Sequence, residues 1–172
     1  PALQALQRYW QEENLGEEYF FQAIDMVSWG GYDLNSVQAV AWIALVLYSQ
    51  QSLMRGSTCL AMNSTLPHLS GILQKIGTDP SACTVEHLKQ LFTPEAAPTL
   101  IGGSEDFRPL ILNEDRSLLY HQKNLLFEQT LLHFLNRRLQ LQLEIPSVAQ
   151  TQQALIAVLE QSPIMVGTNR LQ

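Results

Sequence analysis

The stretch VQAVAWIALVLY, from Val37 to Tyr48, constrains the fold of this chain more than any other feature of its sequence. It is the most apolar segment of the chain. At about 12 residues it is too short to cross a bilayer, which needs about 20. A helix that is apolar on nearly every face has to be enclosed by other elements. The sequence therefore predicts a central helix from Val37 to about Gln51, with Asn35 or Ser36 as its N-terminal cap.

The composition provides enough apolar material for a core around that helix. Of the 172 residues, 46% are apolar and 15% are charged, which is typical of a globular protein and argues against disorder. The length suits one domain, or one domain with a small appendage. The formal net charge of −6 argues against non-specific DNA binding by the whole domain, because phosphate contacts need lysine and arginine.

Charge is distributed unevenly along the chain. Acidic residues crowd the N-terminal part and are opposed there only by Arg8. They are Glu12, Glu13, Glu17, Glu18, Asp25 and Asp33. From Arg108 to Arg138 the balance is basic, with Arg108, Arg116, Lys123, Arg137 and Arg138 against three acids.

Further helices are predicted on both sides of the central one, from apolar residues at helical spacing and from Gly breaks. They are Ala2–Asn14, Glu17–Gly31, Pro67–Gly77 and Val85–Phe92. We expect Pro67 to lie in the first turn of its helix, and Thr84 to cap the helix that begins at Val85. The segment 93–107 is rich in Pro and Gly, which predicts a loop.

Two short apolar runs predict a β-hairpin. PLIL begins at Pro109 and SLLY at Ser117, and the polar break 113–116 between them suits a loop built around a type I turn. Two strands alone are barely stable, so the run TCLAMN (58–63) is the expected third strand. The predicted fold is α+β and mostly α-helical. Helices surround the central apolar helix, beside a small antiparallel sheet of a hairpin at about 109–121 and a strand at about 58–63.

After Lys123 the apolar period changes to that of an amphipathic helix. Phe127, Leu131, Leu135 and Leu139 recur at every fourth position, and the polar stripe consists of Gln129, His133, Asn136 and Gln140. This helix is predicted to run for roughly five turns and to stop before Pro146. One more helix is expected from Ser147 to Gln161, ended by Ser162-Pro163, with no clear element after it. We therefore divide the chain into a domain at 1–145 and a helical linker at 146–172.

The sequence offers little for catalysis. None of His68, His87, His121 and His133 has the spacing of a helical metal site. We interpret His133 as a solvated residue of the polar stripe, and His121 as an ordinary residue at a strand end.

The sequence also gives no support for a nucleophilic cysteine or a phosphate-binding loop. Cys59 has neither a helix N-terminus nor a basic neighbour beside it that would activate its thiol, so it is expected to be packed. Cys59 and Cys83 are interpreted as free, buried thiols in a reducing cytoplasm. Gly102-Gly103-Ser104 is followed by acids instead of Gly-Lys-Ser/Thr, which excludes a phosphate-binding loop.

Two groups of residues are candidate contacts with macromolecules. Arg8, Tyr9 and Trp10 are the expected partner-binding residues, because aromatic residues and arginine are enriched in protein interfaces. Lys123, Arg137 and Arg138 could contact DNA phosphates. Adjacent arginines near a helix C-terminus more often complement the helix dipole.

Two segments resemble RecD proteins, the alpha subunits of exodeoxyribonuclease V. Ser36–Met62 is similar to an apolar helix, loop and G-H-V-C-L-x-L strand of that family, matched at Gly56, Cys59 and Leu60. Pro109–Leu131 is similar to its P-L-I-L-x-x-x-R-L-Y-L-x-R-x-W-x-x-E motif. The matching residues are Pro109, Leu110, Ile111, Leu112, Arg116, Tyr120, Lys123 (in place of Arg) and Glu128. The sequence departs from the family at Ser57, where His is frequent, and at Leu125, where Trp is usual. The resemblance spans roughly Glu17 to Ile145.

The resemblance implies a role in DNA repair and recombination. RecD proteins are ATP-dependent 5′-to-3′ helicases of the RecBCD complex, which processes double-strand breaks. This chain contains no G-x-x-x-x-G-K-[ST] and so lacks the loop and lysine that hold ATP phosphates. The resemblance therefore implies a non-catalytic N-terminal domain that docks a motor onto RecC, and through the complex onto RecB. ATP and Mg would belong to that motor. We expect no cofactor in this chain, only indirect contact with DNA, no membrane association and a cytoplasmic location.

Two other functions stay open at this point. The basic residues from Arg108 to Arg138 would suit an accessory domain that binds single-stranded DNA. A small cytosolic enzyme or ligand-binding protein, with a site assembled only in three dimensions, is the other alternative.

Overall fold

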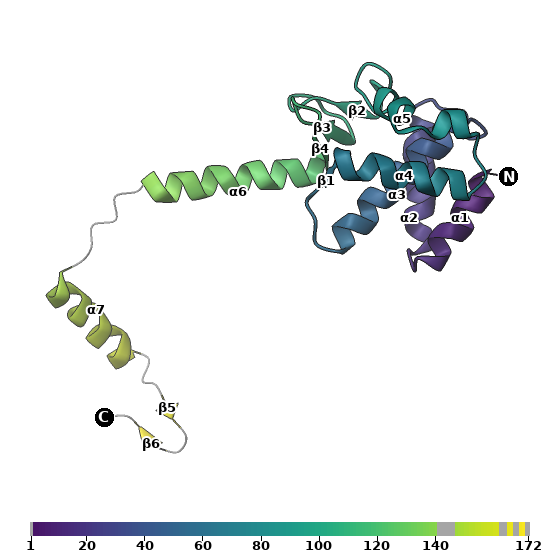
Figure 1. Ribbon diagram of the computed structural model, residues 1–172. Coiled ribbons are helices and arrows are strands. Elements are labelled where there is room, and N and C mark those ends of the chain that lie inside the picture. Colours follow the sequence, from purple (N-terminus) through teal and green to yellow (C-terminus); the bar gives the residue numbers. More distant parts are fainter. Residues whose placement is uncertain (1, 141–146, 162–164, 167–168, 171–172) are drawn as a thin grey trace. The chain divides into compact units, whose positions relative to one another are not determined.

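The computed structural model describes residues 2–140, 147–161, 165–166 and 169–170 (Figure 1). The chain divides into two compact units, Pro1–Leu131 and Leu132–Gln172, and each is described by itself. The hydrophobic core formed by the described residues lies in the first unit, with members from Leu6 to Leu119.

Helix α3 (Val37–Met54) lies at the centre of the first unit, as predicted (Figure 1). Every residue from Ala39 to Leu47 is 2% exposed or less. Helices α1 (Ala2–Glu12), α2 (Glu17–Trp29) and α4 (Met62–Lys75) pack against it. Ser36 is the cap, since its Oγ accepts a hydrogen bond from the backbone N–H of Ala39 at 3.1 Å.

Helix α4 begins at Met62, so the prediction that Pro67 lies in the first turn was wrong. Met62, Leu66, Leu69 and Leu73 are buried at helical spacing and extend the helix upstream of the proline. Side chains also support the first turn, because Thr65 Oγ1 donates to the Ala61 carbonyl at 2.9 Å. Pro67 removes one intrahelical hydrogen bond without ending the helix.

A short 3₁₀ turn, Pro80–Cys83, leads from α4 to α5 (Val85–Leu91). Thr84 caps α5 as predicted, and its Oγ1 accepts from the backbone N–H of His87 at 3.2 Å. Both cysteines are free, with Cys83 buried as expected and Cys59 partly exposed.

The sheet has four strands in the order β1-β4-β3-β2. They are β1 (Cys59–Ala61), β2 (Ile101–Gly102), β3 (Leu110–Leu112) and β4 (Leu118–His121). The predicted hairpin β3–β4 and the predicted third strand β1 are confirmed, and both pairings are antiparallel. Strand β2 lies within the predicted loop and was not expected; it pairs parallel to β3 and makes the sheet mixed. Strand β2 was missed because its two residues, one of them glycine, are too few to show the alternation of a strand.

The two faces of the sheet have different neighbours. Leu110, Leu112 and Leu119 join the hydrophobic core. Ile111 and Tyr120 are buried on the opposite face, as alternation along a strand requires. The hairpin closes through a hydrogen bond from the Arg116 N–H to the Asn113 carbonyl at 2.9 Å.

Helix α6 (Gln122–Gln140) follows β4 directly, and α7 spans Val148–Gln161. Both helices were predicted, but the expected stop before Pro146 and the break at Ser162-Pro163 lie outside the described residues. Near the C-terminus, β5 (Met165–Val166) pairs with β6 (Asn169–Arg170), where no element was expected. Among the described residues, no helix has the length and apolar character to cross a membrane.

Candidate functional site

The predicted partner-binding residues lie on α1, but Trp10 is not available to a partner. Its side chain is 2% exposed and belongs to the core, so its assignment as a surface anchor was wrong. Trp10 continues the helical stripe that begins with Leu3 and Leu6, and that stripe faces α3. Tyr9 is half-buried, and burial, then Glu13 and Tyr48, raise the pKa of its phenol. Only Arg8 of the three is exposed.

The candidate DNA contacts lie along α6 without forming one patch. Lys123 precedes Arg137 by 14 positions, a rise of about 21 Å in an α-helix. Lys123 Nζ lies 5.6 Å from the ring centroid of Phe127, and the Arg138 guanidinium lies 5.5 Å from that of Phe134. Arg137 and Arg138 are exposed at the C-terminal end of the helix, where they complement its dipole.

One close pair of potentially catalytic groups joins α3 to β4. Nε2 of His121 lies 2.7 Å from Oγ of Ser49, and that hydroxyl donates to the Val46 carbonyl at 2.7 Å. Because a hydroxyl has one hydrogen, Ser49 then accepts from His121. Burial lowers the pKa of the imidazole and favours its neutral form.

The surroundings of this pair leave no space for a substrate. The cavity beside it, which Cys59 also lines, has a volume of about 10 Å³, whereas ligand pockets occupy roughly 300–1,000 Å³. The pair is therefore a structural link between α3 and the sheet. Within the described ranges, no cluster of three His, Cys, Asp or Glu side chains could hold a metal ion.

The most unusual surface is the apolar side of α6. We define the α6 apolar face as Phe127, Leu131, Phe134, Leu135 and Leu139. Their exposed fractions are 60%, 58%, 54%, 45% and 84%. An amphipathic helix of a globular protein normally buries this stripe, and exposed apolar patches mark interaction sites.

A hollow of about 270 Å³ borders this face and places a polar acceptor in apolar surroundings. Thr58, Asn124, Phe127, Glu128 and Leu131 line it. Oε2 of Glu128 is buried and has no hydrogen-bond partner among the described residues.

A second hollow of about 200 Å³ lies between α6 and the loop before β3. Its lining includes Ile111, Leu125, Leu126 and Phe107, the last of which is 91% exposed. Hollows with apolar residues in their lining thus lie on both sides of the first turns of α6.

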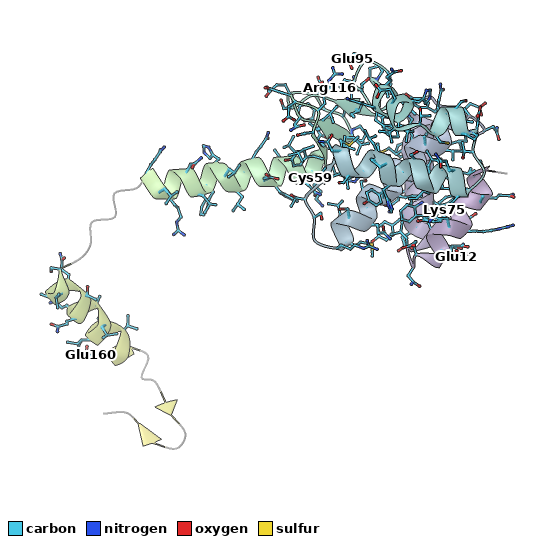
Figure 2. The ribbon with its side chains drawn as sticks, viewed as in Figure 1. Glu12, Cys59, Lys75, Glu95, Arg116 and Glu160 are labelled. Carbon is cyan, nitrogen blue, oxygen red and sulfur yellow. The ribbon has the colours of Figure 1, made fainter. Side chains whose placement is uncertain are left out.

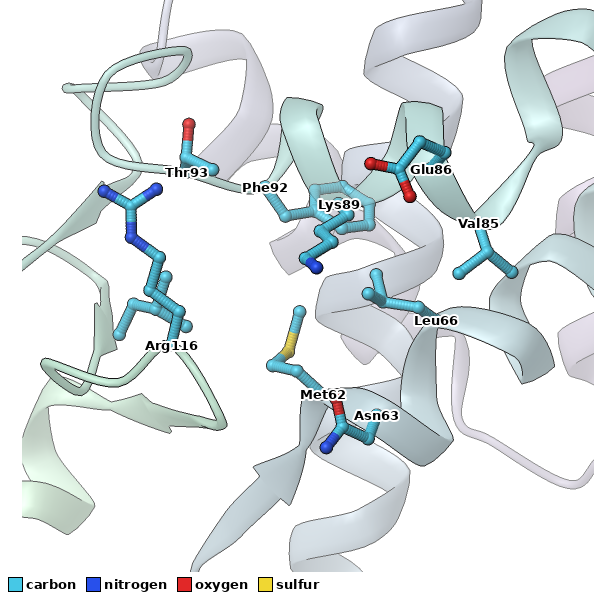
Figure 3. Close-up of a pocket in the computed structure, with 10 residues that line it drawn as sticks. Met62, Asn63, Leu66, Val85, Glu86, Lys89, Phe92, Thr93 and Arg116 are labelled. Atoms are coloured by element: carbon cyan, nitrogen blue, oxygen red, sulfur yellow. The ribbon is translucent and has the colours of Figure 1, made fainter.

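A separate concavity, which we call the α4–α5 cavity, has a volume of about 210 Å³ (Figure 3). It is lined by Met62, Asn63, Leu66, Val85, Glu86, Lys89, Phe92, Thr93, Leu112 and Arg116. In Figure 3 Arg116 lies on one side of the cavity and Glu86 on the other, with Lys89 between them. Arg116 also pairs with Glu95 at 2.5 Å, and the two are labelled in Figure 2. Hydrogen bonds from its own backbone, then from Arg116 and Thr93, hold the pKa of Glu95 below its usual value.

The sequence predicted the apolar stripe of α6 but not the α4–α5 cavity. The four-residue recurrence from Phe127 to Leu139 identified the apolar stripe of α6, although not that it would be exposed. The α4–α5 cavity combines residues from three separate segments, α4, α5 with the residues after it, and the hairpin. No local pattern connects them, so only the fold could reveal it.

No protein-family model, no curated protein and no solved structure matches this chain. A function for the chain is therefore inferred from these surfaces and from the two segments that resemble RecD proteins.

Proposed function

We propose that this chain forms a non-catalytic docking domain of a RecD-type exodeoxyribonuclease V alpha subunit, and that the α6 apolar face binds a RecC-type subunit. The observation that carries the proposal is the exposure of five large apolar side chains on one side of α6. Interfaces derive most of their binding free energy from a few such anchors. A docking surface of this kind requires no catalytic residues.

The arrangement of the two resembling segments supports the same proposal. The first segment contains β1 and the second contains β4, and Cys59 pairs with Tyr120 in the antiparallel register of those strands. The segments are far apart in the sequence but adjacent in the sheet. They thus form one structural unit, which leads directly into α6.

The remaining parts of the proposal follow from the resemblance. ATP and Mg would bind in a motor domain of such a subunit. This chain would contact RecB and DNA only indirectly, through the other parts of the complex. The expected location is the cytoplasm.

The test is co-elution of this chain with a RecC-type subunit from the same source on size exclusion. Wild-type chain is expected to co-elute at micromolar concentration, and the double variant Phe127→Ser, Leu131→Ser is expected to lose the complex. Trp29→Ser is the matched control, because Trp29 is 86% exposed on α2, away from α6. Absence of a wild-type complex, or equal binding by the double variant and the control, would contradict the proposal.

Binding of single-stranded DNA is the second candidate, favoured by the exposed Arg137 and Arg138. It predicts an affinity that falls steeply with salt and falls again when both arginines are replaced by serine. Binding that is absent or insensitive to salt would eliminate this candidate.

A further inference from the structure

We propose that the solvent-facing side of α2 binds an arginine-containing segment of a protein partner. We define the α2 outer face as Phe21, Gln22, Asp25, Ser28 and Trp29, all of which are exposed. This inference goes beyond the proposed function, because the face belongs to α2 and does not depend on the identity of a RecC-type partner.

The α2 outer face carries two large aromatic side chains that do not contribute to the core. Trp29 is 86% exposed and Phe21 is 55% exposed. Successive residues of an α-helix are about 100° apart, which places the exposed positions of α2 on one side. Phe20, Ala23 and Val27, on the opposite side, are buried in the core. Because the packing of α2 is complete without the two exposed aromatic residues, they are available to another molecule.

The charge of this part of the chain selects a cationic partner. Asp25 lies on the α2 outer face, between the two aromatic residues in the sequence, and α2 contains no lysine or arginine. From residue 2 to residue 54, six acids are opposed by Arg8 alone. Among the described residues, Asp25 makes no ion pair. A partner that binds here therefore meets a negative surface.

The elements that contact α2 do not cancel this negative charge. Helix α3, against which α2 packs, has no charged residue from Val37 to Met54. The segment 96–100 reaches the end of α2 through a 2.9 Å hydrogen bond from Thr99 Oγ1 to the Gly30 carbonyl, and it is uncharged as well. The carboxylate on the outer face thus remains available to a cation from outside.

The C-terminal half of α2 lacks the cations that usually stabilise such a position. The C-terminal end of a helix dipole is negative and favours lysine or arginine nearby, but the last turn of α2 has no basic residue. Glu17 and Glu18 stabilise the dipole from the first turn. Asp25, by contrast, lies in the half where its charge opposes the dipole. A bound cation would relieve this repulsion.

Arginine matches this combination of groups better than lysine or an apolar residue does. Its planar guanidinium can stack on an aromatic ring while its N–H groups donate to a carboxylate. Trp29 follows Phe21 by eight positions, a rise of about 12 Å, with Asp25 midway. In an extended peptide, residues i and i+4 are about 13 Å apart, and i+2 points to the same side. A segment Arg-x-Arg-x-Arg therefore fits the spacing of the three side chains.

The probe for this site is the acetylated, amidated peptide Arg-Ser-Arg-Ser-Arg, titrated calorimetrically into the full 172-residue chain. One control peptide has citrulline at each arginine, which keeps the shape and removes the charge. A second has lysine at each arginine, which keeps the charge and removes the planar group. We expect saturable binding that weakens with salt, about tenfold weaker binding of the citrulline peptide, and several-fold weaker binding of the lysine peptide.

Trp29 provides a readout at the site itself. Trp10 and Trp42 are 2% and 0% exposed, so quenching of tryptophan fluorescence by acrylamide reports mainly on Trp29. The probe contains no tryptophan. We expect it to protect Trp29 from acrylamide at the concentrations that saturate the calorimetric signal.

Matched variants locate the site. Asp25→Asn and Trp29→Ser are each expected to weaken binding about fivefold or more. Glu114→Gln removes one negative charge at an exposed residue of the hairpin turn, and Phe107→Ser removes an aromatic side chain that is 91% exposed outside α2. Both controls are expected to bind like wild type. All four positions are exposed, so circular dichroism should show unchanged folds.

Four results would overturn the inference. The first two are absence of saturable binding by wild type, and equal weakening by Asp25→Asn and Glu114→Gln. The third is equal protection of Trp29 by free arginine amide at the same guanidinium concentration, which would indicate a site for small cations. The fourth is a dimer in sedimentation that both Asp25→Asn and the pair Arg137→Ser, Arg138→Ser abolish, which would assign the face to a second copy of this chain.

The same variants separate this inference from the proposed function. Phe127→Ser, Leu131→Ser is expected to bind the arginine peptide like wild type, because it leaves α2 unchanged. Trp29→Ser is expected to lose the peptide and to keep the RecC-type subunit. Failure of the RecC docking and failure of this inference are therefore distinguishable.

Discussion

At the residue scale, His121 is the side chain whose protonation most directly opposes the native packing. Its pKa in the folded protein is below the usual 6.5 because of burial, and its Nε2 contacts Ser49. The unfolded chain therefore binds the proton more readily than the folded chain. As pH falls through about 6.5, the free energy of unfolding should decrease, and this decrease should end only below the folded pKa.

The predicted slope is at most about 1.4 kcal/mol per pH unit for this one proton. Urea unfolding between about pH 5.5 and 8 measures it, above the range in which Glu95 and Asp115, whose pKa values are lowered, take up protons. His121→Gln keeps a donor for Ser49 but cannot ionise, so it should remove most of the slope. His133→Asn, at an exposed position of α6, should retain it. An unchanged slope in His121→Gln would assign the effect to other groups.

Arg116 adopts a backbone conformation that ordinary side chains disfavour. Its φ is +58°, at the turn of the hairpin. Arg116→Gly and Arg116→Ala both remove the pair with Glu95, so they differ mainly in the backbone. We expect the glycine variant to be more stable than the alanine variant by roughly 1 kcal/mol, measured from urea midpoints. Glu114 lies in the same turn but has no positive φ, so Glu114→Gly should not be more stable than Glu114→Ala.

At the element scale, the sequence predicted those elements that have their own periodicity. Helix α3 was identified by continuous apolar character, α6 by a four-residue recurrence, and the hairpin by two apolar runs around a polar break. Strand β2 and the early start of α4 were missed for different reasons. β2 is defined by its neighbour β3 and not by its own composition, and Pro67 obscured the buried stripe that begins at Met62.

Gly102 in β2 provides a test of how tightly this strand is held. A Cβ added there would lie 2.6 Å from Cβ of Asp106 and 2.8 Å from Cγ of Arg108. Asp106 is itself fixed by a hydrogen bond from the Gly103 N–H to its Oδ2 at 2.8 Å. Gly102→Ala should therefore force the loop to shift, at a cost of roughly 1–3 kcal/mol in free energy of unfolding.

Gly103→Ala is the matched control for that variant, because its nearest added contact would be 3.8 Å away. Thermal or urea unfolding of both variants compares the two positions. Equal stability of the two would mean that the loop between β2 and β3 adjusts freely.

At the scale of the whole molecule, the core should be independent of α7. All core residues lie between Leu6 and Leu119, and the described residues from Ser147 onward whose exposure is defined are exposed. A chain ending after Gln140 should therefore unfold in urea with a free energy within about 0.5 kcal/mol of the full chain. A loss greater than about 1 kcal/mol would show that the segment beyond Gln140 contributes to the stability of the core.

The candidate surfaces were less predictable than the fold, because they depend on how the whole molecule packs. Trp10 was assigned to a surface because of its neighbours Arg8 and Tyr9, but tertiary packing directs its side chain toward α3. Conversely, Lys89 and Arg116 have no sequence relation and share a cavity only because the hairpin lies near α5. Exposure and proximity are properties of the assembled core, which periodicity alone does not determine.

The complete burial of Cys83 has a kinetic consequence. Its side chain is 0% exposed, and burial followed by the nearby Asp79 raises the pKa of its thiol. An alkylating reagent can react with this sulfur only when the surrounding helices separate, whereas Cys59 is a partly exposed residue in the folded chain. The rate of alkylation at Cys83 therefore measures how often the core opens spontaneously. Alkylation at Cys59 in the same sample serves as the control that active reagent is present.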